Sequence, residues 1–251
     1  MKNLFSLLFF LVCTSKIQAA DITISTTSGS DKIQFALSKL KKALAEKGDV
    51  LSVKALGEKA QMVVSTTDNT LKAEGFSLKR EKDILKINGG DERGAMYGIL
   101  EIAQQLRLGT TLSTIQDKKE EPTTEFRAIK FNSPYMAYRT GEVATQHDWT
   151  CRDLKFWEKY LDNMAENRFN VLSLWSLHLF HYMVKSKSFP EASHFTDDEM
   201  GEWRKFWRQL FRMAHERGIE TYIINWNTFV SPSFAREIGR ASCRERVCML
   251  V

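Results

Sequence analysis

Apolar positions in the first half of the chain follow two periods, which predict strands and helices in alternation. ITIST (22–26) alternates like a strand, and a helix is expected to follow it, with Ser30 as N-cap and Gly48 as its stop. The apolar face of this helix consists of Ile33, Ala36, Leu37, Leu40 and Leu44. Four short strand-like runs come next: VLSVKAL (50–56), QMVVST (61–66), GFSLKRE (75–81) and DILKING (83–89).

A second helix is predicted after Gly89 and Gly90, and its apolar face consists of Met96, Ile99, Leu100, Ile102, Ala103 and Leu106. This first half, residues 20–108, therefore reads as an α+β unit with helices on one side of a small sheet. The stretch 109–125 is polar and contains Pro122, so we interpret it as a linker.

After the linker the pattern changes to strands that are apolar throughout, separated by amphipathic helices. The strands are FRAIKFN (126–132), FNVLSLWSLH (169–178) and IETYIINWN (219–227). A helix is expected from a cap at Thr150, with Asp153 completing a capping box, through Asn167. Another is expected from the capping box of Thr196 and Glu199 to Gly218. This order predicts a parallel sheet covered by helices, either a (β/α)8 barrel or an open doubly wound sheet.

Composition agrees with an ordinary globular protein, since 43% of the 251 residues are hydrophobic and 27% are charged. The formal net charge of +5 is a weak signal. Lys2 and Lys16 belong to the leader discussed below, and the tail 237–251 holds three arginines against two glutamates. The remaining body has no basic signature for nucleic acid, so no nucleic-acid partner is expected.

The first nineteen residues have the pattern of a secretion signal. Lys2 precedes an apolar run, 4–12, which is too short to span a bilayer permanently, and Ala19 and Ala20 suit a signal peptidase. The residues before Cys13 fit a lipidation site poorly, so we expect an exported protein, periplasmic or secreted, without stable membrane insertion. Cys151 is then the one cysteine of the body, which excludes an internal disulfide there.

Three motifs that could indicate a binding or reactive site have simpler structural explanations. NGGDERGAMYG (88–98) lacks the spacing of a phosphate or dinucleotide loop, so we interpret it as a tight strand-to-helix turn. His178 and His181 lack the further ligands that a metal site needs, and Cys151 has no obvious paired base. No metal and no cofactor are therefore expected.

Binding residues are expected where the parallel strands end. The three ends read FNSPYMAYR, LWSLHLFH and NWNTF. Aromatic planes that cover the C–H face of a sugar, together with amide, imidazole and guanidinium groups that bind its hydroxyls, suit a carbohydrate, and Arg139 suits a sugar carboxylate. The candidate substrate-binding residues are Asn132, Tyr135, Arg139, Trp175, His178, Asn225, Trp226 and Asn227. The simpler alternative, that Trp175 and Trp226 are core residues, stays open.

GFSLKREKDILKINGGDERGAMYGILEIAQQL (75–106) resembles the accessory domain that precedes the barrel in family 67 α-glucuronidases and family 20 β-hexosaminidases. FRAIKFN, CRDLKFWEKYLDNMAENRFNVLSLWSLH and RMAHERGIETYIINWN resemble the first three strands of a glucuronidase-like barrel. The resemblance implies an α/β protein: an accessory domain followed by the first three βα units of a (β/α)8 barrel in 126–236. It also implies a glycoside hydrolase that acts on oligo- or polysaccharides, with uronic-acid-bearing glycans among the implied substrates.

No catalytic residue is assigned. The resemblance places the catalytic carboxylates beyond the third strand, and nothing singles out Glu142 or Asp148. A barrel needs roughly 250 residues, so the chain is expected to be a fragment, or its fold a smaller open sheet. The tail EIGRASCRERV (237–247) resembles a sequencing adapter read in frame and is expected to be non-native. The alternatives are a secreted carbohydrate-binding protein without catalysis and a β-hexosaminidase-like enzyme.

Overall fold

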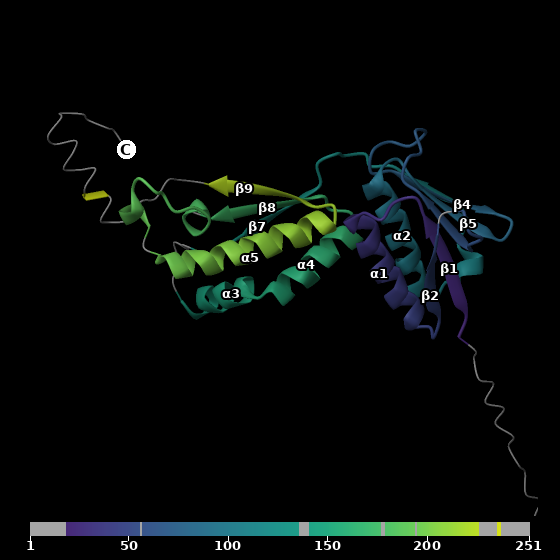
Figure 1. Ribbon diagram of the computed structural model, residues 1–251, viewed down its shortest axis with the longest axis horizontal. Coiled ribbons are helices and arrows are strands. Elements are labelled where there is room, and N and C mark those ends of the chain that lie inside the picture. The colour runs from purple at the N-terminus through teal and green to yellow at the C-terminus, as the bar shows by residue number, and fades with distance from the viewer. Residues whose placement is uncertain are drawn as a thin grey trace, which may run out of the picture.

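The computed structural model describes residues 19–55, 57–135, 141–176, 179–193, 195–225 and 235–236. Within them the chain forms an elongated molecule of two units, each built on its own sheet (Figure 1). The predicted leader 1–19, apart from Ala19, and the predicted tail 237–251 lie outside the described residues.

The first unit contains a six-stranded mixed sheet in the order β2-β1-β3-β5-β4-β6. Its strands are β1 (Asp21–Thr26), β2 (Val50–Lys54), β3 (Met62–Ser65), β4 (Phe76–Glu81), β5 (Ile84–Gly89) and β6 (Lys118–Glu120). The first three and β5 are parallel, whereas β4 is antiparallel to β5 and β6. Alternating burial, seen in β5, places one face of the sheet on the core and the other toward water.

Two helices, α1 (Asp31–Ala45) and α2 (Glu92–Arg107), cover the core face of this sheet (Figure 1). The predicted apolar faces are buried, and Gly48 ends the α1 region with a φ of +86°. Ser30 is at the N-cap position but its side chain makes no capping hydrogen bond. Asp91 caps α2, since its carboxylate accepts a hydrogen bond of 2.7 Å from the backbone of Gly94.

Two glycines of α2, Gly94 and Gly98, allow this helix to approach its sheet closely. A Cβ on Gly98 would lie 2.7 Å from Ile87 Cγ2 of β5, and one on Gly94 would lie 2.0 Å from the carbonyl oxygen of Gly75. The helix can therefore pack this tightly on its sheet only without side chains at these two positions.

The segment predicted as a linker contains regular structure, which corrects that interpretation. A short 3₁₀ helix, η1 (Leu112–Thr114), precedes β6, and β6 extends the first sheet by pairing with β4. Because the segment is polar, its edge-strand role was not visible in the hydrophobic pattern. Main-chain pairing with β4 and the buried side chain of Ile115 hold it on the sheet.

The second unit contains a parallel sheet in the order β7-β8-β9. Its strands are β7 (Ala128–Asn132), β8 (Val171–Ser176) and β9 (Glu220–Asn225), and its helices are α3 (Glu142–Arg152), α4 (Leu154–Glu166) and α5 (Asp197–Glu216). Two 3₁₀ helices, η2 (Leu179–Tyr182) and η3 (Pro190–Ala192), follow β8. The capping box of Thr196 and Glu199 is confirmed at the start of α5, and Gly218 follows the helix with a φ of +68°.

The expected single helix from Thr150 is wrong, because the chain breaks at Asp153. This residue has an extended φ/ψ of −81° and 112°, ends α3 and caps α4 by accepting a hydrogen bond from the Lys155 backbone. Glu142 and Asp148 lie on α3, before this break. Thr150, the predicted cap, lies within α3, and Asp153, predicted to complete its capping box, is itself the N-cap of α4.

Helices cover one face of the second sheet and leave the other face uncovered in the described part of the chain (Figure 1). Phe131 points to α4, where its ring lies 4.7 Å from that of Trp157, and Leu174 is fully buried. Tyr222 and Ile224, which alternate with the covered residues of β9, are 46% and 43% exposed. Parallel strands with helices outside and an apolar inner face are the arrangement of a (β/α)8 barrel, so this unit has the fold of its first part.

The carboxyl ends of β7, β8 and β9 point away from the first unit, while their amino ends face it (Figure 1). The amino-terminal edge of the second sheet thus lies next to the first unit, and the carboxyl-terminal edge does not. Among the described helices, none is long and apolar enough to cross a membrane.

Candidate functional site

The carboxyl ends of the three strands meet at one edge, as the sequence predicts. Asn132 of β7 is the register partner of Trp175 of β8, and Ser176 is the partner of Asn225 of β9. Asn132 is exposed and Trp175 is half-buried. An amide and an indole therefore lie side by side at this edge, on the face that helices leave uncovered.

Tyr135 has a different role from the one predicted. It is 2% exposed, its hydroxyl donates a 2.7 Å hydrogen bond to the carbonyl of Cys151, and its ring packs against Tyr182, Trp203 and Trp207. Burial raises the pKa of its hydroxyl far above the ordinary value. With its ring and hydroxyl both occupied, Tyr135 anchors the loop after β7 and is not placed to contact a substrate.

The other predicted residues are not placed by the structure. Arg139, His178, Trp226 and Asn227 lie outside the described residues, and for Asn225 the structure describes the backbone alone. Their role in substrate binding stays a prediction. Of the three predicted residues whose side chains the structure describes, Asn132 and Trp175 lie at the strand ends and Tyr135 lies in the core.

Lys130 is a residue of this face that the sequence analysis missed. It lies two residues before Asn132, is exposed, and its ammonium nitrogen lies 4.8 Å from the centre of the Trp175 ring. A cation at this distance is attracted to the face of an indole. The available signal was a lysine between the apolar residues Ile129 and Phe131, at a position that a barrel turns inward.

Cys151 and His147 lie on α3 beside the end of β7, but they do not form a reactive pair. The Cys151 sulfur lies 3.7 Å from His147 Nδ1 and is fully buried. Burial, with a smaller effect from Asp148, raises the pKa of the Cys151 thiol to about 12, so the thiol is protonated at neutral pH. In the described ranges no group of three or more His, Cys, Asp or Glu side chains could hold a metal ion.

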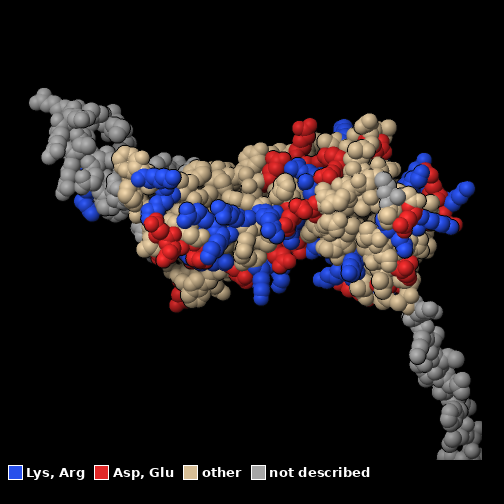
Figure 2. Space-filling view, in the orientation of Figure 1, with Lys and Arg blue, Asp and Glu red and all other residues tan. Residues whose placement is uncertain are grey.

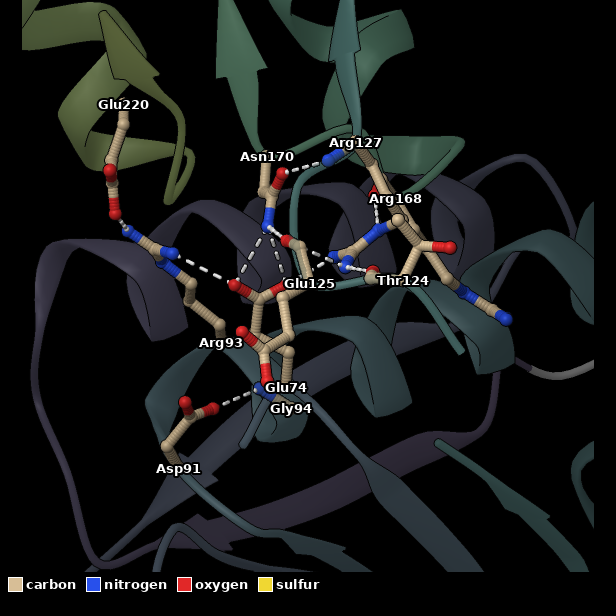
Figure 3. Close-up of polar contacts among 10 residues, drawn as sticks. All are labelled: Glu74, Asp91, Arg93, Gly94, Thr124, Glu125, Arg127, Arg168, Asn170 and Glu220. Carbon is tan, nitrogen blue, oxygen red and sulfur yellow. Dashed lines mark hydrogen bonds and ion pairs between the residues drawn. The ribbon is translucent and has the colours of Figure 1, made fainter. Parts of the chain in front are cut away.

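A second polar cluster lies at the opposite, amino-terminal end of the sheet, where the two units meet. Glu74, which has a positive φ of 61°, is its centre. Its carboxylate accepts hydrogen bonds of 2.8 Å from Arg93 and 3.0 Å from Asn170, and it also pairs with Arg127 (Figure 3). Arg93 is shared with Glu220, at the start of β9, through a further bond of 2.8 Å. The Glu74 carboxylate of the first unit thus binds Arg127 before β7 and Asn170 before β8. Through Arg93 it is also linked to Glu220 at the start of β9.

Asn170 completes the cluster by fixing the backbone before β7. Its amide oxygen accepts from the Arg127 backbone at 2.9 Å, and its amide nitrogen donates to the Glu125 carbonyl at 2.7 Å (Figure 3). Burial alone would raise the pKa of Glu74, but the hydrogen bonds from Asn170, Arg127 and Arg93 outweigh it and hold the pKa below its ordinary range. The carboxylate is therefore ionised at neutral pH.

Further ion pairs extend this contact between the units. Figure 2 shows acidic and basic side chains intermingled where they meet. The additional pairs are Lys39 with Asp162 and Glu166, Arg107 with Glu166, and Arg168 with Glu101 and Glu120. A network of this kind, with partly buried members, holds two units in one orientation. We therefore assign it a structural role.

The strand-end site offers an aromatic face, an amide and an ammonium group. This set can bind a hydroxylated ring with an anionic substituent. Of the described residues at the three strand ends, none is a carboxylic acid, so the pair of acids that glycoside hydrolysis uses is not found in this part of the chain.

Comparison with solved structures shows which known proteins share this fold. The chain matches a family 138 glycoside hydrolase that targets pectin rhamnogalacturonan II, with 26% identity and a TM-score of 0.73 over 87% of this chain and 26% of that one. The fold is that of a glycoside hydrolase. Family 20 β-N-acetylhexosaminidases from Streptomyces coelicolor and Bacteroides fragilis match 82% of the chain at TM-scores of 0.54 and 0.51, with 14% and 15% identity.

The chain spans about a quarter of the family 138 enzyme and about two fifths of each hexosaminidase. No protein-family model matches the sequence. The glycoside-hydrolase-like fold therefore rests on structure, and the expected relation to hexosaminidases is confirmed at the level of the fold. The narrower assignment to family 67 stays a prediction.

Proposed function

We propose that this chain is part of an exported glycoside hydrolase that cleaves glycosidic bonds in an acidic polysaccharide, in the manner of an α-glucuronidase. The match to the family 138 enzyme carries the proposal, because it extends over both units at 26% identity. The resemblance of the sequence to glucuronidases and the cation on the uncovered face both favour an acidic sugar. Export rests on the leader pattern in 1–19.

The uncovered face supports the proposal that the catalytic groups lie in a longer parent protein. Tyr222 and Ile224 would face the interior of a closed barrel, where apolar residues normally lie. Further βα units would cover this face and supply acids at their own strand ends. The first unit would then hold the amino-terminal end of the barrel through the cluster around Glu74.

Two alternatives remain as predictions. A β-hexosaminidase-like enzyme is favoured by the family 20 matches, although these show the fold alone. A secreted carbohydrate-binding protein without catalysis would use the same strand-end residues and need no acid pair. The two enzyme proposals predict different substrates, and the binding protein is expected to cleave none. An activity assay can therefore distinguish the three.

The test has two parts. The source DNA is sequenced across the locus, and the encoded protein is assayed on aryl α-glucuronide, α-galacturonide and β-N-acetylglucosaminide. We expect further βα units with acidic strand ends and turnover of a uronide. Turnover of the N-acetylglucosaminide alone would favour the hexosaminidase, and a stop codon after the chain would favour the binding protein.

The 251-residue chain itself provides a separate prediction. We expect it to have no glycosidase activity, because its described strand ends lack an acid pair. Measurable turnover of any of the three aryl glycosides by the purified chain would contradict the location of the catalytic acids beyond the third strand.

A further inference from the structure

We propose that Lys130 determines specificity for an acidic sugar by binding its carboxylate at the strand-end site. The inference rests on the proposed carbohydrate function and adds a residue and a ligand charge to it. Lys130 would bind and position the sugar; it is not assigned a part in bond cleavage.

The charge balance of the uncovered face supports this role. Residues of this face come from alternate positions of three strands: Ala128, Lys130 and Asn132; Val171, Ser173 and Trp175; Glu220, Tyr222 and Ile224. Lys130 and Glu220 are its charged members. Glu220 lies at the amino-terminal end and pairs with Arg93 at 2.8 Å. Within the described residues, Lys130 has no carboxylate partner, so its charge is available for an anion.

The geometry places this charge beside groups that suit a sugar. Residues two apart on a strand lie about 6.7 Å apart, and neighbouring strands about 4.8 Å. Lys130, Asn132 and Trp175 therefore fit within the width of a single sugar ring. The Lys130 ammonium lies 4.8 Å from the centre of the Trp175 ring, which keeps it near the strand ends without an ion pair.

A cation–π contact of this kind is weak enough to exchange for a ligand. At an exposed site such a contact is a weak attraction, whereas a charge-assisted hydrogen bond to a carboxylate is stronger. On binding, the ammonium would turn toward the sugar carboxylate, while Asn132 would bind a ring hydroxyl.

The test compares two sugars that differ at one carbon. The full chain is labelled with 5-fluorotryptophan, the Trp175 signal is assigned with Trp175→Phe, and D-galacturonate or D-galactose is titrated by ¹⁹F NMR. We expect galacturonate to shift the Trp175 signal with at least tenfold higher affinity than galactose. Lys130→Met is expected to abolish the preference and Lys130→Arg to retain it. Lys159→Met, on the exposed side of α4, is the matched control and is expected to behave like wild type.

The outcomes separate this inference from the proposed function. If both sugars bind equally, or if Lys130→Met retains the preference, the role of Lys130 is refuted while the carbohydrate site stands. If neither sugar shifts the Trp175 signal, both the site and the role of Lys130 are contradicted. Circular dichroism of each variant shows whether a loss of binding comes from misfolding.

Discussion

The free faces of the two sheets differ in chemistry. On the first sheet the free face carries Ser77, Lys79, Lys86 and Asn88, and Lys86 pairs with Glu81 at 2.6 Å. On the second sheet the free face carries the partly exposed apolar residues Trp175, Tyr222 and Ile224 beside Lys130, Asn132, Ser173 and Glu220. A polar face is stable in water, whereas exposed aromatic and aliphatic side chains grouped on one face are typical of a contact surface. The first sheet therefore needs helices on one face only, and we propose that the second sheet makes contacts on its free face as well.

The largest expected effect tests the two faces of the second sheet against each other. Leu174→Ala should lower the free energy of unfolding by about 2 to 5 kcal/mol, because it leaves a cavity under the helices. Leu174 is fully buried, whereas Ile224 is 43% exposed. In the 251-residue chain, Ile224→Ala should cost less than about 1 kcal/mol. Urea unfolding followed by circular dichroism measures both.

The same pair of variants becomes more informative in the longer parent that we propose. If further strands cover the free face there, the cost of Ile224→Ala should rise toward that of Leu174→Ala. An unchanged small cost in the parent would contradict the assignment of this face to a barrel interior.

The next effect tests the contact between the units. Glu74→Gln should cost about 1 to 3 kcal/mol, because Arg93 and Arg127 lose their shared carboxylate. Glu158→Gln, on the exposed side of α4, is the matched control and should leave stability unchanged. Chemical denaturation at pH 7 provides the measurement.

The effect of Glu74→Gln should also depend on pH. Because the pKa of Glu74 in the folded protein lies below its unfolded value, the carboxylate stabilises the fold fully above the unfolded pKa of about 4.3. This contribution is lost as the pH falls through the lower, folded pKa. The difference between wild type and Glu74→Gln should therefore be largest near neutral pH and shrink below about pH 4. A difference that is constant from pH 7 to pH 3 would assign it to packing instead.

The sequence predicted the elements that have strong periodicity, and it failed where contacts between distant segments decide. The apolar faces of α1, α2 and α5 and the three parallel strands were predictable from spacing alone. β6 was not, because its place on the sheet depends on main-chain pairing with β4. The helix break at Asp153 was not predictable either, because the hydrophobic pattern does not show where α3 ends and α4 begins.

The candidate site shows the same division. The meeting of Asn132 and Trp175 follows from the rule that parallel strands end at one edge. The burial of Tyr135 does not follow from it, since the aromatic partners of Tyr135 come from η2 and α5, far along the chain. Glu74 likewise gave no signal, because its three side-chain partners, Arg93, Arg127 and Asn170, come from segments that only the fold brings together.

The smallest expected effect compares a glycine within a helix of the second unit with a glycine in the turn after a helix of the first unit. Gly201 lies within α5, where an added Cβ would meet nothing within 4 Å. Gly201→Ala should therefore raise the free energy of unfolding by about 0.5 to 1 kcal/mol, because it restricts the unfolded chain and favours the helix. Gly48 is equally open, but its φ of +86° is strained for alanine, so Gly48→Ala should destabilise the protein. Thermal unfolding of both variants measures the opposite signs. Two destabilised variants would show that the outer face of α5 is in contact with something more than solvent.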